Sequence, residues 1–262
     1  MSGWLDPVHR ALDARDVPVA LFVRDDDAGW ADERLAGLLD TCAWHGVPLA
    51  LAVIPSELTG ERAQWLTERR RAYPARLGFH QHGWAHMNHE PTGRKCEFGA
   101  SRSLDDLRMD LTQGHARMVE AFGASVDPVF TPPWNRCVEA VGPLLVEMGV
   151  EVLSRDVTAG VLGVAGLREC PVHVDWSGKK RGVRLTRNQL GASCADVLTN
   201  RPVAGVLFHH AVMDDLDLED VSALLDTLRR HSMVQFVSLV EAASLATSPP
   251  VPDATTAAEA SA

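Results

Sequence analysis

Residues 78–89 contain four of the eleven histidines of this 262-residue chain. Three residues separate His82 from His86, a spacing that allows two imidazole rings to bind one metal ion. The apolar residues before them predict a strand, and Gly83 predicts that a loop follows. Because functional residues gather in loops at strand ends, we interpret the histidines as lining the mouth of a sheet or barrel. The alternative is a solvated loop, or histidines with structural hydrogen bonds.

Polar residues also follow other expected strands, close to their carboxyl ends. These clusters are residues 25–27, 132–136, 175–176 and 209–210. In a parallel α/β barrel all strands open on one face, so residues distant in sequence meet in one pocket. Two histidines and one carboxylate suit metal-assisted hydrolysis, in which a second carboxylate takes the proton of water and another histidine protonates the leaving group. Taken alone, each cluster is also explained by a turn, a helix cap or a structural hydrogen bond.

Strands and helices alternate along the chain, which favours parallel strands joined by βαβ units. We predict strands at 17–23, 48–54, 76–80, 128–131, 150–154, within 168–176, at 203–209 and at 234–237. We predict helices at 33–45, 61–71, 103–122, 138–148, 193–200, 218–231 and from Ser238 to about 245. Residues 83–102 show no period and predict a long loop, which at this length is usually functional or disordered. The length suits one α/β domain over residues 1–246, followed by a disordered tail at 247–262.

The composition excludes several classes of protein. The formal charge of −10 argues against a nucleic-acid partner. No apolar run has the length of a signal peptide core or a membrane span, so we expect a cytoplasmic protein without a membrane partner. The five cysteines form no Cys-x-x-Cys pair, which indicates neither a disulfide framework nor a cysteine-bound zinc ion.

In this order the motifs resemble those of the polysaccharide deacetylase (NodB-homology, carbohydrate esterase) family, over about residues 19–210. The resemblance implies an α/β fold, a distorted (β/α) barrel with about seven parallel strands. It also implies hydrolysis of N- or O-acetyl groups with a divalent metal, often zinc. By this resemblance Asp26 is the general base and Asp27 a metal ligand, with Asp25 as the alternative register. His82 and His86 match the two histidine ligands.

The later motifs of the family match in part. The fifth motif, Leu-x-x-His, fits residues 207–210, which makes His210 the general acid and leaves His209 as the alternative. The third motif, Arg-x-Pro-aromatic, corresponds to residues 131–134, and the fourth ends in Asp-Trp, as residues 175–176 do. From these matches and the neighbouring histidines we expect the substrate to contact Pro133, Trp134, Arg136, Asp175, Trp176, His80 and His89.

The chain departs from the family in several places. Thr131 stands where the family has an arginine that orients the catalytic carboxylate, and Arg136 or Arg24 are the candidates to replace it. The Thr-Phe pair that precedes the aspartates in the family is absent. The low aromatic content of 6% and the absence of a signal peptide indicate a divergent, intracellular-type member that acts on a small molecule rather than a polymer.

We therefore predict a metal-dependent hydrolase that removes an acetyl or other acyl group from an N-acylated small molecule, such as an amino sugar or a metabolite. Zn²⁺ is the first candidate, although Co²⁺, Mn²⁺, Ni²⁺ and Fe²⁺ bind the same ligand set. One alternative is another metal-dependent C–N hydrolase or isomerase on the same fold. A second is a catalytically inactive protein that binds a metal or ligand. A homo-oligomer is compatible with the sequence.

Overall fold

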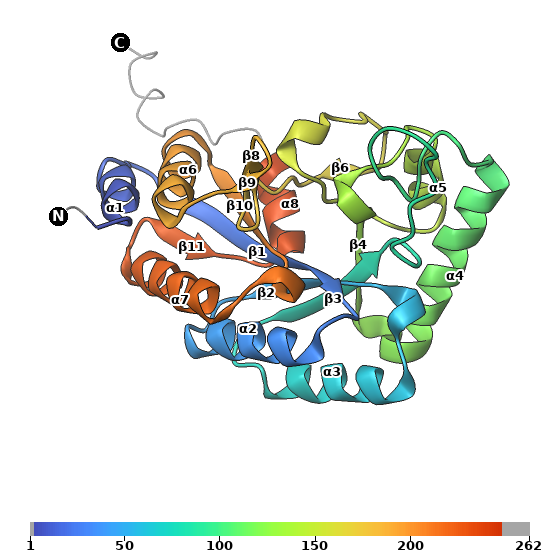
Figure 1. The fold of residues 1–262 in the computed structure, drawn as a ribbon, viewed down its shortest axis with the longest axis horizontal. Helices are drawn as coiled ribbons and strands as arrows, with labels where there is room; N and C mark the ends of the chain where they lie inside the picture. Colours follow the sequence, from blue (N-terminus) through green and yellow to red (C-terminus); the bar gives the residue numbers. More distant parts are fainter. Residues whose placement is uncertain (1–2, 248–262) are drawn as a thin grey trace, which may run out of the picture.

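A curled, parallel sheet forms the centre of the molecule, and helices pack around its outer side (Figure 1). The computed structural model describes residues 3–247. Within these residues nine strands pair in the order β6-β5-β4-β3-β2-β1-β10-β7, with β11 paired to the start of β1, and every pair is parallel. The strands are β1 (Val19–Ala28), β2 (Leu49–Val53), β3 (Leu77–His82), β4 (Val126–Thr131), β5 (Val152–Leu153), β6 (Arg168–Glu169), β7 (Val174–Asp175), β10 (Val203–Phe208) and β11 (Val234–Phe236).

The two ends of this strand order meet in one segment of chain. Strands β6 and β7 are successive parts of residues 168–175, which pair first with β5 and then with β10. The segment therefore links the edges of the sheet, and seven strands surround the interior when β6 and β7 are taken together. This confirms the predicted distorted (β/α) barrel with about seven parallel strands.

The helices cover the outer face of the barrel and close one of its ends. Helix α8 packs Leu239, Ala242 and Ala243 against Ala20 and Phe22 of β1, inside the barrel. None of the helices within residues 3–247 is long and apolar enough to span a lipid bilayer. The helices are α1 (Asp6–Asp13), α2 (Asp32–Trp44), α3 (Gly60–Ala72), α4 (Leu104–Phe122), α5 (Val141–Glu147), α6 (Arg187–Asn200), α7 (Asp215–Arg230) and α8 (Leu239–Thr247).

Several elements differ from the sequence prediction. Helix α1 lies in a polar segment where no helix was predicted, and its apolar side is buried in the core with α6. Helix α6 starts at Arg187 rather than at 193 because Thr186 and Gln189 form a capping box. An antiparallel hairpin, β8 (Lys179–Lys180) and β9 (Val183–Arg184), was also not predicted. The predicted loop at 83–102 has no helix or regular strand, and the predicted tail lies, from residue 248 on, outside the described residues.

Side chains along β1 alternate between the two faces of the sheet. Val19, Leu21 and Val23 pack toward the helices, whereas Ala20 and Phe22 face the barrel interior. The same period of two turns Arg24 and Asp26 into the interior and Asp25 toward the helices. Strand alternation therefore decides which charged side chains of this strand reach the open end of the barrel.

We predict that Gly205→Ala lowers the free energy of unfolding by about 1–3 kcal/mol, because a Cβ at this position of β10 collides with the ring of Phe22. Urea unfolding would measure the change. The matched control is Gly60→Ala in α3, where a Cβ meets no heavy atom within 4 Å and the stability should be unchanged or slightly higher. Wild-type stability of Gly205→Ala would contradict the packing of Phe22 on β10.

Candidate active site

A β-bulge in β1 turns two consecutive aspartates toward the same pocket. The pairing register between β1 and β2 shifts between Asp25 and Ala28, and Asp27 has a left-handed backbone with φ of 69°. In a regular strand adjacent side chains point to opposite faces, and a bulge re-aims one of them. As a result Asp26 and Asp27 both line a pocket of about 690 Å³, while Asp25 faces away from it.

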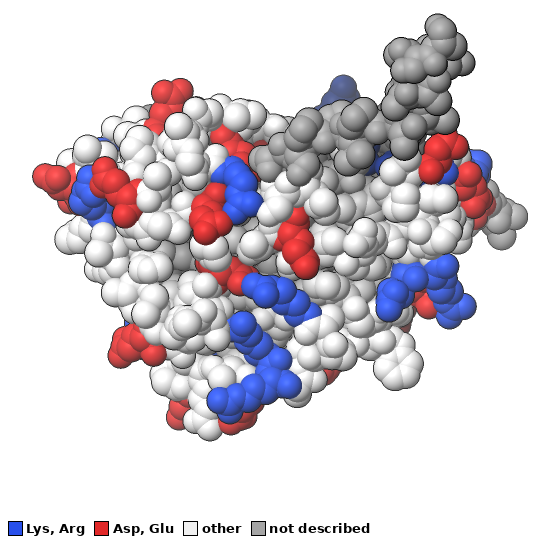
Figure 2. Space-filling view, turned by 180° about the vertical axis from the view of Figure 1, so that it is seen from behind, with Lys and Arg blue, Asp and Glu red and all other residues white. Residues whose placement is uncertain are grey.

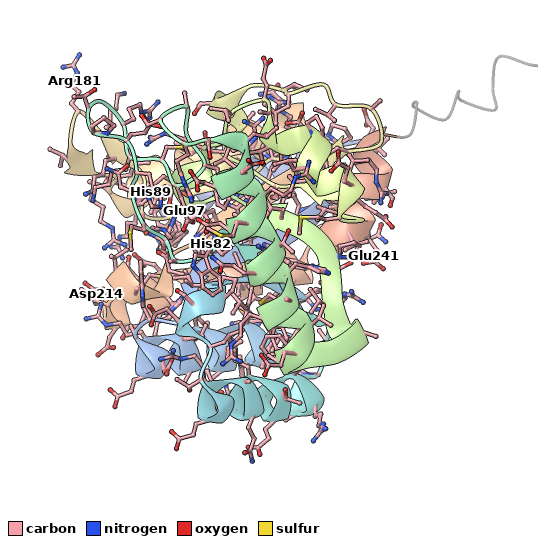
Figure 3. The ribbon with its side chains drawn as sticks, turned by 90° about the vertical axis from the view of Figure 1, so that its right-hand side faces the viewer. His82, His89, Glu97, Arg181, Asp214 and Glu241 are labelled. Carbon is pink, nitrogen blue, oxygen red and sulfur yellow. The ribbon has the colours of Figure 1, made fainter. Side chains whose placement is uncertain are left out.

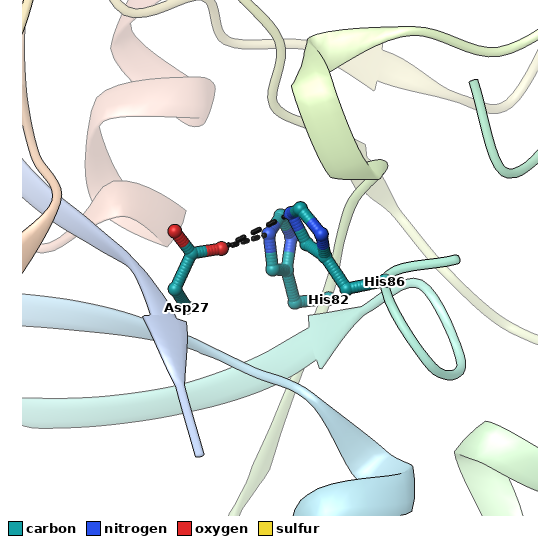
Figure 4. Close-up of side chains that lie close together, drawn as sticks. All are labelled: Asp27, His82 and His86. Carbon is teal, nitrogen blue, oxygen red and sulfur yellow. Dashed lines mark hydrogen bonds and ion pairs between the residues drawn. The ribbon is translucent and has the colours of Figure 1, made fainter. Parts of the chain in front are cut away.

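Asp27, His82 and His86 bring three potential ligand atoms together (Figure 4). Asp27 Oδ1 lies 3.3 Å from His82 Nε2 and 3.1 Å from His86 Nε2. His82 Nδ1 lies 3.0 Å from the carbonyl oxygen of Thr131, and since a carbonyl only accepts, this nitrogen carries the proton. Nε2 then faces a carboxylate oxygen, and although burial alone would lower the pKa of His82, Asp26 and Asp27 raise it. The carboxylate and the ring nitrogen thus share a positive charge, which is a proton on the free ring and can be a metal cation instead.

The three side chains fit a divalent metal ion. Two ligand atoms that are each about 2.1 Å from one ion at a tetrahedral angle lie roughly 3.4 Å apart, which is close to the separations observed here. The hydrogen bond from His82 to Thr131 has the character of the outer contacts that fix a metal-binding histidine. Burial alone would raise the pKa of Asp27, but hydrogen bonds from both histidines hold it well below its usual range. The carboxyl group is therefore an anion, as a metal ligand must be.

Two tryptophan rings contact His86 edge-on, and a buried carboxylate holds the backbone on either side of it. The ring centroids of Trp30 and Trp134 lie 4.8 Å and 4.4 Å from that of His86. Glu97 is fully buried and accepts a hydrogen bond of 2.7 Å from the backbone N–H of Ala85, next to His86. No sequence motif points to Glu97. The only signal was one carboxylate between the apolar neighbours Cys96 and Phe98, in a loop of polar residues.

Unusual backbone conformations gather at this site. Six non-glycine residues within 3–247 have positive φ, and Asp27, His86 and Trp134 line the pocket while Asn135 lies beside it. A side chain in this conformation costs about 1–3 kcal/mol, so it persists where the surrounding contacts impose it. Such residues cluster at active sites, and four of six at one pocket indicate a preorganised site.

Arg24 pairs with Asp26 inside the barrel, and both side chains are almost fully buried. Arg24 Nη2 donates to Asp26 Oδ2 at 3.0 Å, while Nε lies 2.8 Å from Oδ1 as an ion pair outside hydrogen-bonding alignment. The same guanidinium donates to Ser154 and Asn135 at 2.8 Å and 2.7 Å. Burial alone would raise the pKa of Asp26, but Arg24 lowers it, so the carboxylate is charged. Of the two arginines considered as replacements at the third motif, Arg24 makes this contact.

His209 is the histidine of the 209–210 pair that faces the pocket. Its Nδ1 lies 3.5 Å from Asp175 Oδ1, at the end of β7. Burial alone would lower the pKa of His209, but Asp175 and Asp26 raise it to about 9. The ring is therefore protonated at neutral pH and can donate a proton inside the pocket.

His210 lies outside the pocket, which corrects its assignment as the general acid. It is fully buried, and both ring nitrogens are engaged, Nδ1 with Asp25 Oδ2 at 2.6 Å and Nε2 with the carbonyl oxygen of Trp30 at 2.8 Å. Asp25 is buried in the same pair, so the alternative register with Asp25 as a catalytic residue is also corrected. Both residues point toward the helices because they follow the alternation of β10 and β1.

Two residues expected at the substrate lie in the core instead. Trp176 is fully buried, with its ring against those of Trp4 and Phe208. His80 is fully buried below the pocket, bonded to Thr131 Oγ1 at 2.9 Å. Burial and the charge of Arg24 lower the pKa of His80 to about 3, so the ring is neutral. Neither side chain reaches a substrate.

The remaining expected contacts divide between this pocket and its surroundings. Trp134 lines the pocket. Pro133 is buried and packs so closely on Gly83 that a Cβ there would collide with the proline ring. Arg136 points away and donates to the carbonyl oxygen of Lys95 at 2.9 Å. His89 lies in the loop, where its ring is close to Glu97 and Asp110 and outside the pocket (Figure 3).

The pocket also contains residues that lie outside every sequence motif. Lys95 comes from the loop at 83–102, Lys179 and Arg184 come from the β8–β9 hairpin, and Ser177 precedes that hairpin. No local motif points to them because they meet only through the fold. The one available signal was the rarity of lysine, which occurs three times in the sequence.

Comparisons with known proteins support the fold. No family model and no curated protein matches the sequence. Among solved structures, a chain from Mycobacterium smegmatis assigned to the polysaccharide deacetylases has a TM-score of 0.65 at 14% identity, with 88% of this chain and 92% of that chain covered. A family 4 acetyl xylan esterase from Clostridium thermocellum, in complex with a cobalt ion, has a TM-score of 0.57 at 16% identity, covering 88% and 93%.

A CE4 family pseudoenzyme from Bacillus anthracis is also similar, with a TM-score of 0.57 at 15% identity and coverage of 86% of this chain and 66% of that chain. The fold is thus the one shared by polysaccharide deacetylases and family 4 carbohydrate esterases. The resemblance given by the sequence motifs is confirmed at the level of the fold.

We predict that Asp25→Asn lowers the free energy of unfolding by about 3–5 kcal/mol, because it leaves a buried histidine without its ionic partner. Burial alone would lower the pKa of His210, but Asp25 raises it to about 9. Stability from this shift is complete below the unfolded histidine pKa of about 6.5 and is lost as the pH rises through about 9.

The difference in stability between wild type and Asp25→Asn should therefore shrink from pH 6.5 to 9, measured by urea unfolding at each pH. Asp226→Asn, which breaks an exposed pair with Arg230, is the control and should have little effect. Equal stability losses in the two variants would contradict a buried ion pair.

Proposed function

We propose that this protein is a divergent member of the polysaccharide deacetylase family, a metal-dependent hydrolase that removes an acetyl or other acyl group from an N-acylated small molecule. One observation carries the proposal. Asp27, His82 and His86 converge at one point of a pocket that also contains a charged Asp26 and a protonated His209. These are the parts that amide hydrolysis needs: ligands for a metal, a base and an acid.

Asp27, His82 and His86 would hold the divalent metal. Zinc suits two imidazoles and one carboxylate, and the Clostridium thermocellum neighbour was solved with cobalt. Mn²⁺, Ni²⁺ and Fe²⁺ bind the same kind of ligand set. When bound, such a metal lowers the pKa of water and polarises the carbonyl group under attack.

Asp26 and His209 would carry the protons. The Asp26 carboxylate, held by Arg24, accepts the proton that water loses as it attacks the acyl carbon. His209, charged below about pH 9, donates its proton to the leaving nitrogen as the C–N bond breaks. Arg24 acts as a positioning residue, because it fixes Asp26 and keeps it ionised.

The pocket supports a small substrate rather than a polymer. Its volume of about 690 Å³ lies within the range of about 300–1,000 Å³ that small-molecule sites occupy. Trp134 is the single tryptophan, tyrosine or phenylalanine among the residues that line it, and sugar polymers are usually stacked on several such rings. Since a structural neighbour is a pseudoenzyme, the case for catalysis depends on the side chains and not on the fold.

We predict that the purified protein contains about one transition metal per chain, as a site with three protein ligands does. The double variant His82→Ala/His86→Ala and the single variant Asp27→Ala should lose the metal, because each removes a ligand. Elemental mass spectrometry measures the content, and circular dichroism confirms the fold. His9→Ala, which removes an exposed histidine of α1 outside every group of potential metal ligands among the described residues, is the control and should keep the metal.

Metal retained by the double variant would place the metal site elsewhere. If the wild type takes up neither zinc nor cobalt, the metal-dependent hydrolase is excluded. The protein would then fit the inactive, ligand-binding alternative.

We predict that Asp26→Asn and His209→Gln each keep the metal but lower kcat for acetate release roughly 10²–10⁴-fold, because each removes a proton-transfer group. Acetate release from a panel of N-acetylated amino sugars and amino acids is the assay. His210→Gln should instead reduce stability with a smaller effect on kcat per folded molecule. Wild-type turnover by His209→Gln, together with a dead but folded His210→Gln, would restore His210 as the acid.

A further inference from the structure

The lysines of this protein are concentrated at the candidate active site. The sequence has three, Lys95, Lys179 and Lys180, whereas the other 22 of its 25 basic residues are arginines. Lys95 and Lys179 both line the pocket that contains the metal-ligand cluster. They come from the loop at 83–102 and from the β8–β9 hairpin, whose tip at Arg181 projects on the same side of the molecule as His89 of the loop (Figure 3).

The charges of the two pocket lysines are not neutralised by the protein. Lys95 Nζ lies 5.8 Å from the ring centroid of Trp134, and within residues 3–247 no carboxylate pairs with Lys95 or Lys179. Elsewhere, many arginines pair with carboxylates, as Arg108 does with Glu147. On the face opposite to the view of Figure 1, basic and acidic side chains are interspersed (Figure 2). Both lysines are exposed to solvent, and their gathering at one pocket of a chain with a charge of −10 makes that pocket a site where an anion is attracted.

Arg184 and Ser177 add two fixed hydrogen-bonding groups to the same wall of the pocket. Arg184 Nη2 pairs with Asp217 Oδ2 at 2.7 Å, and Asp217 in turn accepts from the indole N–H of Trp176 at 3.3 Å. This chain of contacts anchors the guanidinium to the core. The hydroxyl of Ser177 is buried and has no hydrogen-bond partner among the described residues, so the wall of the pocket contains one unsatisfied polar group.

We propose that the substrate carries a phosphate monoester, and that Lys95, Lys179 and Arg184 bind it with the help of Ser177. The acylated part of the substrate rests on the proposed function. Because Asp217 compensates Arg184, the wall has two uncompensated positive charges. A phosphate monoester has about −1.5 to −2 charges at neutral pH, which matches this wall, whereas a carboxylate has one charge and a neutral sugar has none. The substrate class is thus a phosphorylated, N-acylated small molecule.

The test compares two probes that differ by the phosphate alone, N-acetylglucosamine 6-phosphate and N-acetylglucosamine. Isothermal titration calorimetry with the metal-loaded protein at low ionic strength measures both affinities. Two charge-assisted contacts predict that the phosphorylated sugar binds about tenfold tighter or more. The double variant Lys95→Met/Lys179→Met should lose this preference.

Lys180→Met is the matched control. Lys180 is the neighbour of Lys179 in β8 but points to the other face of the hairpin and does not line the pocket. It should keep the preference for the phosphorylated sugar. A preference reduced equally in both lysine variants reflects the overall charge and would overturn the proposed site.

The outcomes separate this inference from the proposed hydrolase. Selective binding of the phosphorylated sugar without acetate release would support the phosphate site and reject hydrolysis of this amide. Equal affinities, or no binding of the phosphorylated sugar, would overturn the phosphate site even if acetate is released from other N-acetylated molecules. A preference that survives Lys95→Met/Lys179→Met but disappears in His82→Ala/His86→Ala would assign the phosphate to the metal, and would also overturn the inference.

Discussion

Four consecutive charged residues at the end of the central strand impose the main constraint on this structure. Burying an unpaired charge in a protein interior costs roughly several kcal/mol of folding free energy. Each of residues 24–27 therefore needs a partner. Arg24 and Asp26 pair with each other inside the barrel, and Asp25 pairs with His210 on the helix side. Asp27 meets the two histidines that follow β3. The histidine partners lie at or just after the ends of β3 and β10, which are far apart in sequence. The charges of β1 therefore determine which side chains are needed at the carboxyl ends of those strands.

The bulge at Asp27 separates the structural charges from those of the pocket. Regular alternation along β1 turns Asp25 toward the helices and Asp26 toward the barrel interior. Without a bulge, Asp26 would be the only one of the three aspartates to face the open end of the barrel. The left-handed Asp27 adds a second carboxylate on the inner side. One pair then stabilises the sheet against the helices, and the other two carboxylates, Asp26 and Asp27, face the pocket. A local backbone distortion thus converts a buried strand end into a site that has two different carboxylates.

The sequence was sufficient for the fold class and the long loop, and the family resemblance placed Asp27 with His82 and His86 while leaving Asp25 as an alternative register. It left the histidine that faces the pocket open, because the Leu-x-x-His pattern favoured His210 with His209 as the alternative. Strand alternation decides otherwise: Leu207 faces the interior and Phe208 the helices, so the next residue, His209, faces inward. The cationic wall was missed for another reason. Its residues come from a loop and a hairpin that only the folded chain brings together, and no pattern in either segment indicates the contact.

The loss of the third-motif arginine does not by itself argue against catalysis. Thr131 occupies that position at the end of β4, where its backbone carbonyl holds His82 and its hydroxyl holds His80. The guanidinium that pairs with Asp26 comes from Arg24 of β1 instead, and it also contacts Asn135, four residues after Thr131. An ion pair depends on where the guanidinium lies and not on which strand supplies it. Thr131 and Arg24 together thus supply the contacts to the two histidines and the ion pair with Asp26 in a sequence that departs from the motif.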